Sequence, residues 1–383
     1  MLFFINLRYI ISMSNSFTEQ YHKILCPVQP EFLDKYLSIP ILTRLKGVGL
    51  LCGTDWTPFF SNNFYYSRFD HSKGVALLIW NFTHDKAQTI AGLLHDVSTP
   101  AFSHVADFRK GDALTQTATE EDNSSMLASS PELLECLKLD GLTLDQVDNY
   151  HKYPVADNEV PQLSADRLEY MFPSGTALAG NWSLKESFTL EEIEIMYNDL
   201  VLCKNENGIV ELGFKTKSIA EKYVKRVTDI AFFLQQCEDK MALQFPAEVL
   251  NMAVKLNVLK EADFFDLSES EIISKLDKLA SQYSQVDSKA AFEASYSLEK
   301  LAVFIRTYRG FKSITRSEVP LDDYFCINLK VKKRYINPLV SDGTVEGNLY
   351  KAKRITEISA ETDSLIKKFL SYEDLPFSCV KFL

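Results

Sequence analysis

The stretch AGLLHDVSTPAFSHVADF, residues 91–108, is the most informative segment for the fold, and the prediction starts from it. Its apolar residues recur at helical spacing, and Asp85 is placed to cap the helix that they form. The adjacent residues His95 and Asp96 follow the apolar run directly, so both side chains approach a dry region near the end of that helix. Pro100 then fits the first turn of a further short helix.

Helical patterns dominate the chain on both sides of this stretch. Residues 72–83 form an apolar segment without proline, and Pro173 is expected to end a helix that begins at Ser164. Ser268 followed by Glu271 is a capping box before another helix. The remaining predicted helices span residues 217–243, 245–257, 288–308 and 359–371.

Two regions have the pattern of β structure. DLVLCKNENGIVELGF, residues 199–214, has two apolar-rich runs around Asn207-Gly208 and predicts a β-hairpin. YFCINLKVKKRYINPLV, residues 324–340, alternates apolar and basic residues and predicts a half-exposed strand, with a turn at 341–344. The sequence therefore predicts a mainly α fold with a small inserted β-hairpin and a small C-terminal α+β region.

The predicted organisation is one large helical domain over residues 15–310, followed by the α+β region over residues 311–383. Residues 1–14 are expected to be an N-terminal extension. Its segment MLFFINLRYIIS is interrupted by Arg8, is shorter than the ~20 residues of a membrane span, and lacks the flanks of a secretory signal. We expect an upstream start codon with Met13 as the true beginning, and a weak membrane anchor is the alternative.

The composition is that of an ordinary soluble globular protein. Of 383 residues, 46% are hydrophobic and 24% are charged, and 26 Phe with 17 Tyr argue against disorder. The net charge of -11 weighs against a long nucleic acid as partner, because proteins that bind one usually show a broad basic surface. A small anionic ligand stays compatible, since a pocket needs only a few local cations. We expect no membrane partner.

The seven cysteines are scattered, and none forms a CxxC pair. The odd count and the spacing support neither a disulfide framework nor a thiolate zinc site. We therefore expect isolated small core residues in a reducing compartment, which predicts a cytoplasmic protein.

Histidines gather in and before the segment 91–108. Only six occur, and four of them fall between positions 71 and 104. Imidazole and carboxylate groups together suit a divalent Zn, Mn, Fe, Co or Ni ion rather than Ca, and such an ion lowers the pKa of a bound water. A bare His-Asp pair is a weak signal, because a single buried histidine is more often a packed core residue than a ligand.

Three separated blocks strengthen that signal. SRFDHSKGVALL at 67–78, AGLLHDVSTPAFSHVADF at 91–108 and SADRLEYM at 164–171 occur in this order. Together they resemble the HD superfamily of metal-dependent phosphohydrolases, and within it the branch of deoxynucleoside-triphosphate triphosphohydrolases. The resemblance extends to IPILTRLKGVGLL at 39–51 and implies an HD-type helical bundle. It also implies one divalent transition metal held by His71, His95, Asp96 and Asp166.

The resemblance further implies groups that bind the substrate. Arg68, three residues before His71, stands where the family has a phosphate-binding arginine, and a surface ion pair with Asp70 is the alternative. Arg167 and Tyr170 match the family's positions for a basic residue and for a hydroxyl donor to phosphate. The implied substrate is a nucleotide or a related small phosphate ester. A homo-oligomer is expected, because family members oligomerise.

The sequence departs from this family at the groups beside the metal. The branch usually reads HDxGHxPFSH, whereas HDVSTPAFSH has Ser98 for the glycine and Thr99 for the second histidine. A further family histidine near position 120 is replaced by Glu120-Glu121. Threonine is not a useful proton carrier near neutral pH, whereas Glu120 becomes a base if burial raises its pKa. We therefore predict Asp166 and Glu120 as the catalytic proton acceptors.

Two further residues match the family. His104, in PAFSH, is expected to hold a site residue through a hydrogen bond, and a packing role is the alternative. Asp107 falls at a family acidic position and is expected to orient such a group. The basic residues between 306 and 334 read as a solvated strand face, with an anion-binding or subunit-contact surface as the sharper alternative.

Three functions are open on the sequence. The first is a metal-dependent phosphohydrolase that uses metal-activated water. The second is a non-catalytic nucleotide-binding or regulatory protein, because Thr99 and Glu120 stand where the active branch has histidines. The third is a scaffold whose pocket is merely structural.

Overall fold

The structure, a computed structural model, describes residues 16–114, 123–288 and 296–383. It is mainly α-helical, as predicted, and within the described ranges no helix combines the length and the apolarity of a membrane span. The α-helices are α2 (Leu33–Tyr36), α3 (Pro40–Thr43), α4 (Arg68–Thr83), α5 (Lys86–Leu94), α6 (Val105–Arg109), α7 (Asn123–Ala128), α8 (Pro131–Leu139), α9 (Ala165–Leu178), α10 (Leu190–Asn198), α11 (Lys217–Leu234), α12 (Cys237–Lys255), α13 (Asp263–Asp266), α14 (Glu269–Gln282), α16 (Leu298–Gly310), α17 (Ile355–Ile358) and α18 (Ala360–Leu370).

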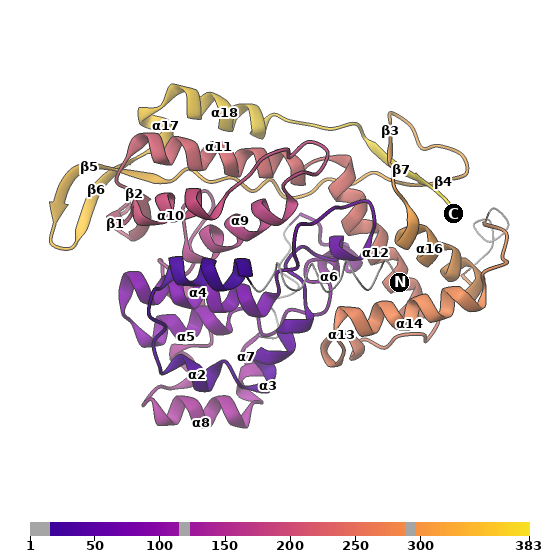
Figure 1. Cartoon of the computed structure of the whole chain (residues 1–383), viewed down its shortest axis with the longest axis horizontal. Coiled ribbons are helices and arrows are strands. Elements are labelled where there is room, and N and C mark those ends of the chain that lie inside the picture. Colours follow the sequence, from indigo (N-terminus) through magenta and orange to yellow (C-terminus); the bar gives the residue numbers. More distant parts are fainter. Residues whose placement is uncertain (1–15, 115–122, 289–295) are drawn as a thin grey trace.

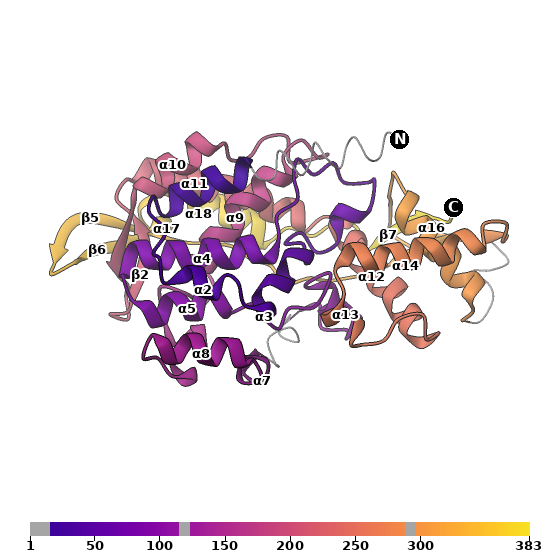
Figure 2. The ribbon, with the colours of Figure 1, turned by 60° about the horizontal axis from the view of Figure 1, so that its bottom comes forward.

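Two hydrophobic cores divide the helices between them. The first core gathers buried residues of α4, α5, α9, α10 and α11, and the second gathers those of α12, α14 and α16. Figures 1 and 2 show the two groups side by side, with α11 leading into α12 at their junction. The predicted helix over 217–243 is therefore wrong in extent. The chain breaks at Gln236, whose backbone is extended, and α12 then runs on to Lys255.

The C-terminal chain, expected as a region of its own from residue 311, is interleaved with the helical part. Strands β5 and β6 pair with the hairpin β1–β2 in a closed barrel, whereas β3, β7 and β4 form a separate sheet. Figure 1 shows this chain running from β4 to β5 and returning along α17 and α18 to β7, so it spans both groups. An isolated two-stranded hairpin has only marginal stability, and β5 and β6 complete it. The strands are β1 (Leu200–Lys204), β2 (Val210–Phe214), β3 (Thr315–Ser317), β4 (Tyr324–Ile327), β5 (Leu339–Glu346), β6 (Leu349–Arg354) and β7 (Phe377–Lys381).

The strand predicted over 324–340 is wrong in its middle. Residues 328–338, between β4 and β5, are neither helix nor strand. The turn predicted at 341–344 lies inside β5, and the chain turns instead at Gly347, which has a φ of +64°. Alternation of apolar and polar residues predicts one exposed face, but a strand also needs a neighbouring strand to pair with.

Pro173 is predicted to end α9, but the helix continues to Leu178. Proline has no N–H group, so the carbonyl of Glu169, four residues earlier, loses its donor within the helix. The buried hydroxyl of Tyr21 donates to that carbonyl at 3.1 Å. A tertiary hydrogen bond therefore replaces the missing helical one and lets α9 run through the proline.

Several local predictions are confirmed. The hairpin forms, with Gly208 at a φ of +78° in its turn. The Asp85 carboxylate caps α5 by accepting from the N–H of Gln88. Ser268 and Glu271 form the capping box of α14.

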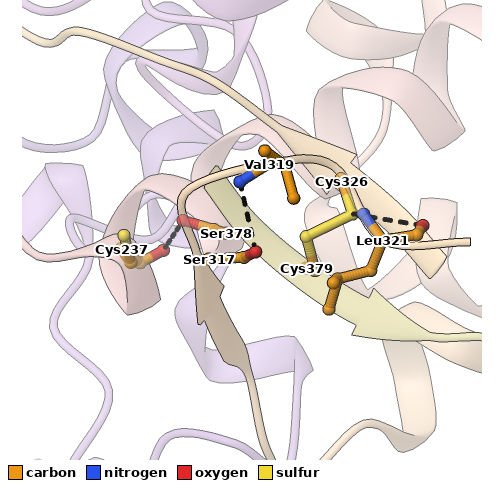
Figure 3. The surroundings of a disulfide bond; sticks show 7 residues. All are labelled: Cys237, Ser317, Val319, Leu321, Cys326, Ser378 and Cys379. Carbon is orange, nitrogen blue, oxygen red and sulfur yellow. Dashed lines mark hydrogen bonds between the residues drawn. A yellow bond between two sulfur atoms is a disulfide. The ribbon is translucent and has the colours of Figure 1, made fainter. Parts of the chain in front are cut away.

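Cys326 and Cys379 form a disulfide bond between β4 and β7 (Figure 3). The expectation that all cysteines are isolated is therefore wrong for these two. They are cross-strand partners in the antiparallel β4–β7 pair, with 4.1 Å between their Cα atoms, although 53 positions separate them in the sequence. Only the pairing of the strands brings them together, so their spacing carries no signal.

Candidate metal centre

The start of α4 positions the first site residues. Ser67 and Asp70 form a capping box, in which each side chain accepts a hydrogen bond from the other residue's N–H. This fixes the first turn of α4, which carries Arg68 and His71. The Asp70 carboxylate is occupied at the helix end, and Arg68 pairs with Asp96 at 2.8 Å. The alternative of a surface pair between Arg68 and Asp70 is therefore wrong.

The four predicted metal ligands converge from three elements. His71 belongs to α4, His95 and Asp96 follow the last residue of α5, and Asp166 lies in the first turn of α9. The Nε2 atoms of the two histidines are 3.2 Å apart. Oδ1 of Asp166 lies 3.2 Å and 3.8 Å from these nitrogens, and Oδ2 of Asp96 lies 3.6 Å and 3.5 Å from them. The ligand atoms of His71, His95 and Asp96 thus all lie within 4.8 Å of one another, and Asp166 lies beside the two histidines.

The hydrogen bonds of the two imidazoles fit a bound cation. Nδ1 of His95 donates to the carbonyl of Gly92 at 2.7 Å, and Nδ1 of His71 contacts the carboxylate of Glu169. Both partners are acceptors, which assigns a ring proton to each Nδ1, so each Nε2 can offer a lone pair to a cation that displaces its own proton. Two lone pairs and two carboxylates at this distance repel one another unless positive charge lies between them. The donor set therefore fits one divalent transition metal.

Glu169 is a site residue that the sequence reasoning missed. Its side chain is fully buried, and the carboxylate oxygen that does not contact His71 accepts from the Tyr66 hydroxyl at 2.7 Å. The Tyr66 hydroxyl also lies 3.2 Å from Nε2 of His22. A carboxylate behind a ligand histidine fixes the orientation of the ring and raises its basicity. The available signal was spacing, because Glu169 follows Asp166 by three positions on one helix face.

The charges at the centre support one another. Burial alone would raise the pKa of Asp96, but the Arg68 guanidinium and both imidazoles hold it well below its usual range. Burial would also raise the pKa of Asp166, and a hydrogen bond from His71 together with the imidazole charges lowers it instead. Burial lowers the pKa of His71, yet the surrounding carboxylates, Glu169 foremost, raise it to about 10. The carboxylates thus favour positive charge where the ligands meet.

Arg68 is held at the site by two loops. Its Nε donates to the Ser103 hydroxyl at 3.0 Å, and that hydroxyl donates to the carbonyl of Gly49 at 2.8 Å. Ser103 has a φ of +51°, in the left-handed region that few residues other than glycine adopt. The guanidinium lines a cavity of about 210 Å³ that opens beside the four ligands. Its position is compatible with the expected phosphate contact.

Thr99, which stands where the family that the sequence resembles has a histidine, bonds the side chain of Asp96. Its hydroxyl donates to Oδ1 of Asp96 at 3.0 Å. Its role in the structure is therefore to orient the carboxylate whose other oxygen pairs with Arg68. Glu120, the other residue at a family-histidine position, lies outside the described residues.

The segment 328–338 brings part of the basic tail into the cavity. Lys332 and Arg334 line the cavity, and the Arg334 side chain is hydrogen-bonded to Tyr170, which lines it as well. For Arg334, a solvated strand face is therefore the wrong interpretation. The sequence shows the run of basic residues, but it does not show that Lys332 and Arg334 line a cavity beside residues far away in the sequence.

The side chain of Arg167 turns away from the cavity. It pairs with Asp157 at 3.1 Å, donates to the carbonyl of Gln162 at 2.8 Å, and bonds both the side chain and the carbonyl of Asn158. Arg167 does not line the cavity. These bonds fix the loop before α9, so the placement does not support the expected phosphate contact.

His104 lines the cavity and rests on Asp107. Nδ1 of His104 is 2.9 Å from Oδ2 of Asp107, which is fully buried at the start of α6. The carboxylate therefore fixes the orientation of the His104 ring. The helix that bears Asp107 begins at Val105, later than the Pro100 start that the sequence predicts, because residues 101–104 form turns.

No protein-family model matches the chain. Among curated proteins, an uncharacterized protein of Bacillus subtilis (strain 168), YdhJ, is similar to it. The two are 24% identical over 253 residues, which cover 64% of this chain and 70% of that protein.

Solved structures share the fold. A phosphohydrolase from Bacteroides thetaiotaomicron VPI-5482 is similar, with a TM-score of 0.54 and 15% identity over 92% of this chain and 96% of the other. A hypothetical protein from Aquifex aeolicus is similar, with a TM-score of 0.57 and 15% identity over 93% of each chain. At this identity the similarity concerns the fold. The chain therefore has the fold of these two proteins, one of which is named as a phosphohydrolase.

Proposed function

We propose that this protein is a metal-dependent phosphohydrolase of the HD type that acts on a nucleotide or a related small phosphate ester. The observation that carries the proposal is the convergence of the four ligands beside a cavity lined by Arg68 and Arg334. A phosphate group needs cations or hydrogen-bond donors around its oxygens as well as a metal. The similar Bacteroides protein is named a phosphohydrolase, which supports the same class of reaction.

The proposed cofactor is one divalent transition metal, Mn, Fe, Zn, Co or Ni, which would supply Lewis-acid stabilisation of phosphate charge and a more acidic water. The chain supplies the other groups. Arg68 and Arg334 bind the phosphate, and Tyr170 donates its hydroxyl hydrogen to a phosphate oxygen. Asp166 is ionised near neutral pH, because its pKa is lowered, and accepts the proton of the attacking water. Glu120 is the second proposed proton acceptor.

A non-catalytic nucleotide-binding protein is the second candidate, and Thr99 favours it. The threonine hydroxyl is used in a hydrogen bond to Asp96 and carries no proton to a leaving group near neutral pH. This candidate shares the metal and the phosphate site with the first. The two differ only in turnover.

One experiment separates the candidates. Purified protein is loaded in turn with each of the five metals, bound metal is quantified, and phosphate or triphosphate release is followed on a panel of nucleotides and simple phosphate esters. The same measurements are made on Asp96→Ala, which removes a ligand. Asp229→Asn, on the exposed surface of α11 in an ion pair with Lys225, is the matched control.

We expect the wild-type protein to bind a stoichiometric metal and to turn over substrate. Asp96→Ala abolishes this turnover, and Asp229→Asn leaves it unchanged. Stoichiometric metal and tight nucleotide binding without turnover would establish the second candidate. Protein that binds no metal, and is indifferent to chelators, would exclude both candidates and leave a structural pocket.

A further inference from the structure

The cavity has an apolar side, which we call the α11–α12 wall. It consists of Ile230 and Leu234 on α11 and of Asp239 and Leu243 on α12, each pair one helical turn apart on the cavity side of its helix. Among the described residues of α11 and α12 that line the cavity, Asp239 is the charged one. The wall is therefore suited to an apolar group, with one carboxyl set into it.

The Asp239 carboxyl has no hydrogen-bond or ion-pair partner in the part of the chain that the structure describes. The residue is only 5% exposed. Burial raises its pKa to about 8. A buried polar group without a partner costs free energy, and this one lines the cavity where a ligand is expected to bind.

The place of Asp239 in its helix makes the missing partner informative. It is the third residue of α12, where a carboxylate ordinarily reaches back to the N–H group of the residue that caps the helix. Here that N–H, of Gln236, already donates to the carbonyl of Phe233 at 3.2 Å. The carboxyl of Asp239 is thus left for the cavity. Carboxylates at the same helical position that do make the capping bond include Asp70, Glu192, Glu271 and Glu357.

We propose that Asp239 is a specificity-determining residue that accepts a hydrogen bond from an N–H or O–H group on the organic part of a phosphate-bearing ligand. The apolar remainder of that part packs on Ile230, Leu234 and Leu243. This inference rests on the proposed phosphohydrolase function, since the metal centre and the two arginines hold the phosphate end. The ligand class is a phosphate ester whose organic part is mainly apolar and carries a hydrogen-bond donor.

The test compares ligands that differ by one donor. Metal-loaded protein is titrated calorimetrically with butyl phosphate and aminobutyl phosphate, with phenyl phosphate and para-aminophenyl phosphate, and with purine riboside monophosphate and adenosine monophosphate. Inorganic phosphate reports the phosphate end alone. The variants are Asp239→Leu, which removes the acceptor, and Asp239→Asn, which keeps an acceptor oxygen of the same reach. Glu192→Gln, at the same helical position on α10, is the control.

We expect wild-type protein to bind the donor-bearing member of at least one pair more tightly, by roughly 10- to 100-fold for a hydrogen bond to a buried acceptor. Asp239→Leu abolishes that preference, Asp239→Asn retains most of it, and the affinity for inorganic phosphate is unchanged in both.

Two results would overturn the proposal: a wild-type protein without preference in any pair, or a preference that survives in Asp239→Leu. Failure of the wild-type protein to bind inorganic phosphate or metal would instead contradict the proposed function. Because Asp239→Asn preserves size and shape, thermal melting of both variants separates loss of recognition from loss of folding.

Discussion

The metal centre and the α11–α12 wall face the same cavity but treat their polar groups in opposite ways. At the metal centre, Asp96 has Arg68 and Thr99 as partners, and His71 has Glu169. On the wall, Asp239 has no partner within the described residues. Groups with partners are held in one geometry, whereas a buried group without a partner is left for a ligand. The partners of Asp96 and His71 thus hold these side chains in position, whereas Asp239 is the residue proposed to recognise the ligand.

Breaking the ion pair of Arg68 and Asp96 is expected to cause the largest loss of stability. Asp96→Ala leaves the buried Arg68 guanidinium without its carboxylate, which should lower the free energy of unfolding of the metal-free protein by about 3–5 kcal/mol. Chemical denaturation in chelator measures it. The exposed pair of Lys225 and Asp229 is the control, because Asp229→Ala should cost at most about 1 kcal/mol. Equal losses of stability in the two variants would contradict the expected difference between the buried and the exposed ion pair.

Removing the carboxyl on the wall should have the opposite sign. The pKa of Asp239 is raised from 3.8 to about 8 by burial, so the folded state holds a proton that the unfolded state releases. Its contribution to stability is complete below pH 3.8 and is lost as the pH rises through about 8. Asp239→Asn should therefore be stabilised relative to wild type, by at most about 1.4 kcal/mol for each pH unit within this window. Denaturation curves across the window measure the difference.

Glu192→Gln is the control for this pH dependence. The Glu192 carboxylate occupies the same helical position on α10, but ion pairs with Lys222 and Arg226 outweigh its burial and lower its pKa. Its contribution to stability is lost as the pH falls, so Glu192→Gln should be less stable than wild type at neutral pH. If both variants shift in the same direction with pH, the difference between the two sites is not as we describe it.

Weakening the support of a ligand should have a smaller effect. Glu169→Gln keeps the size of the side chain but removes the charge behind His71, which should lower the metal affinity by roughly 10- to 100-fold. Competition with a chelating dye measures the affinity. Glu211→Gln, a fully buried carboxylate paired with Arg354 away from the cavity, is the control and should leave the metal affinity unchanged.

The smallest effect is expected from the tail. Arg334→Gln removes a cation from the cavity but leaves the metal ligands intact, so inorganic phosphate should bind about tenfold more weakly while the metal affinity is unchanged. Lys333→Gln is the neighbouring control, because that ammonium bonds the carbonyls of Leu370 and Tyr372. An equal loss in both variants would indicate a general charge effect rather than a contact.

The sequence alone was enough to predict features formed by residues that lie close together along one helix or turn. The pair of His95 and Asp96, the capping box that precedes His71 and the hairpin around Gly208 follow from local spacing. The grouping of the four side chains that we propose as metal ligands was also expected from the sequence, but only because a resemblance supplied the relation between distant blocks. Local spacing cannot supply that relation, because it depends on how helices pack.

Tertiary structure alone decided the rest. Arg167 follows Asp166 directly, yet its bonds to residues of the preceding loop hold it away from the cavity. Arg334, in contrast, reaches the cavity from far along the chain. The disulfide of Cys326 and Cys379 exists because β4 pairs with β7. Asp239 does not make the capping bond expected at its position, because the N–H of Gln236 is already bonded to Phe233. The contacts of Arg334 and of the disulfide join segments far apart in the sequence, so no local pattern encodes them. The bonds of Arg167 and Gln236 join neighbouring segments, and they depend on loop geometry that the pattern of apolar residues does not show.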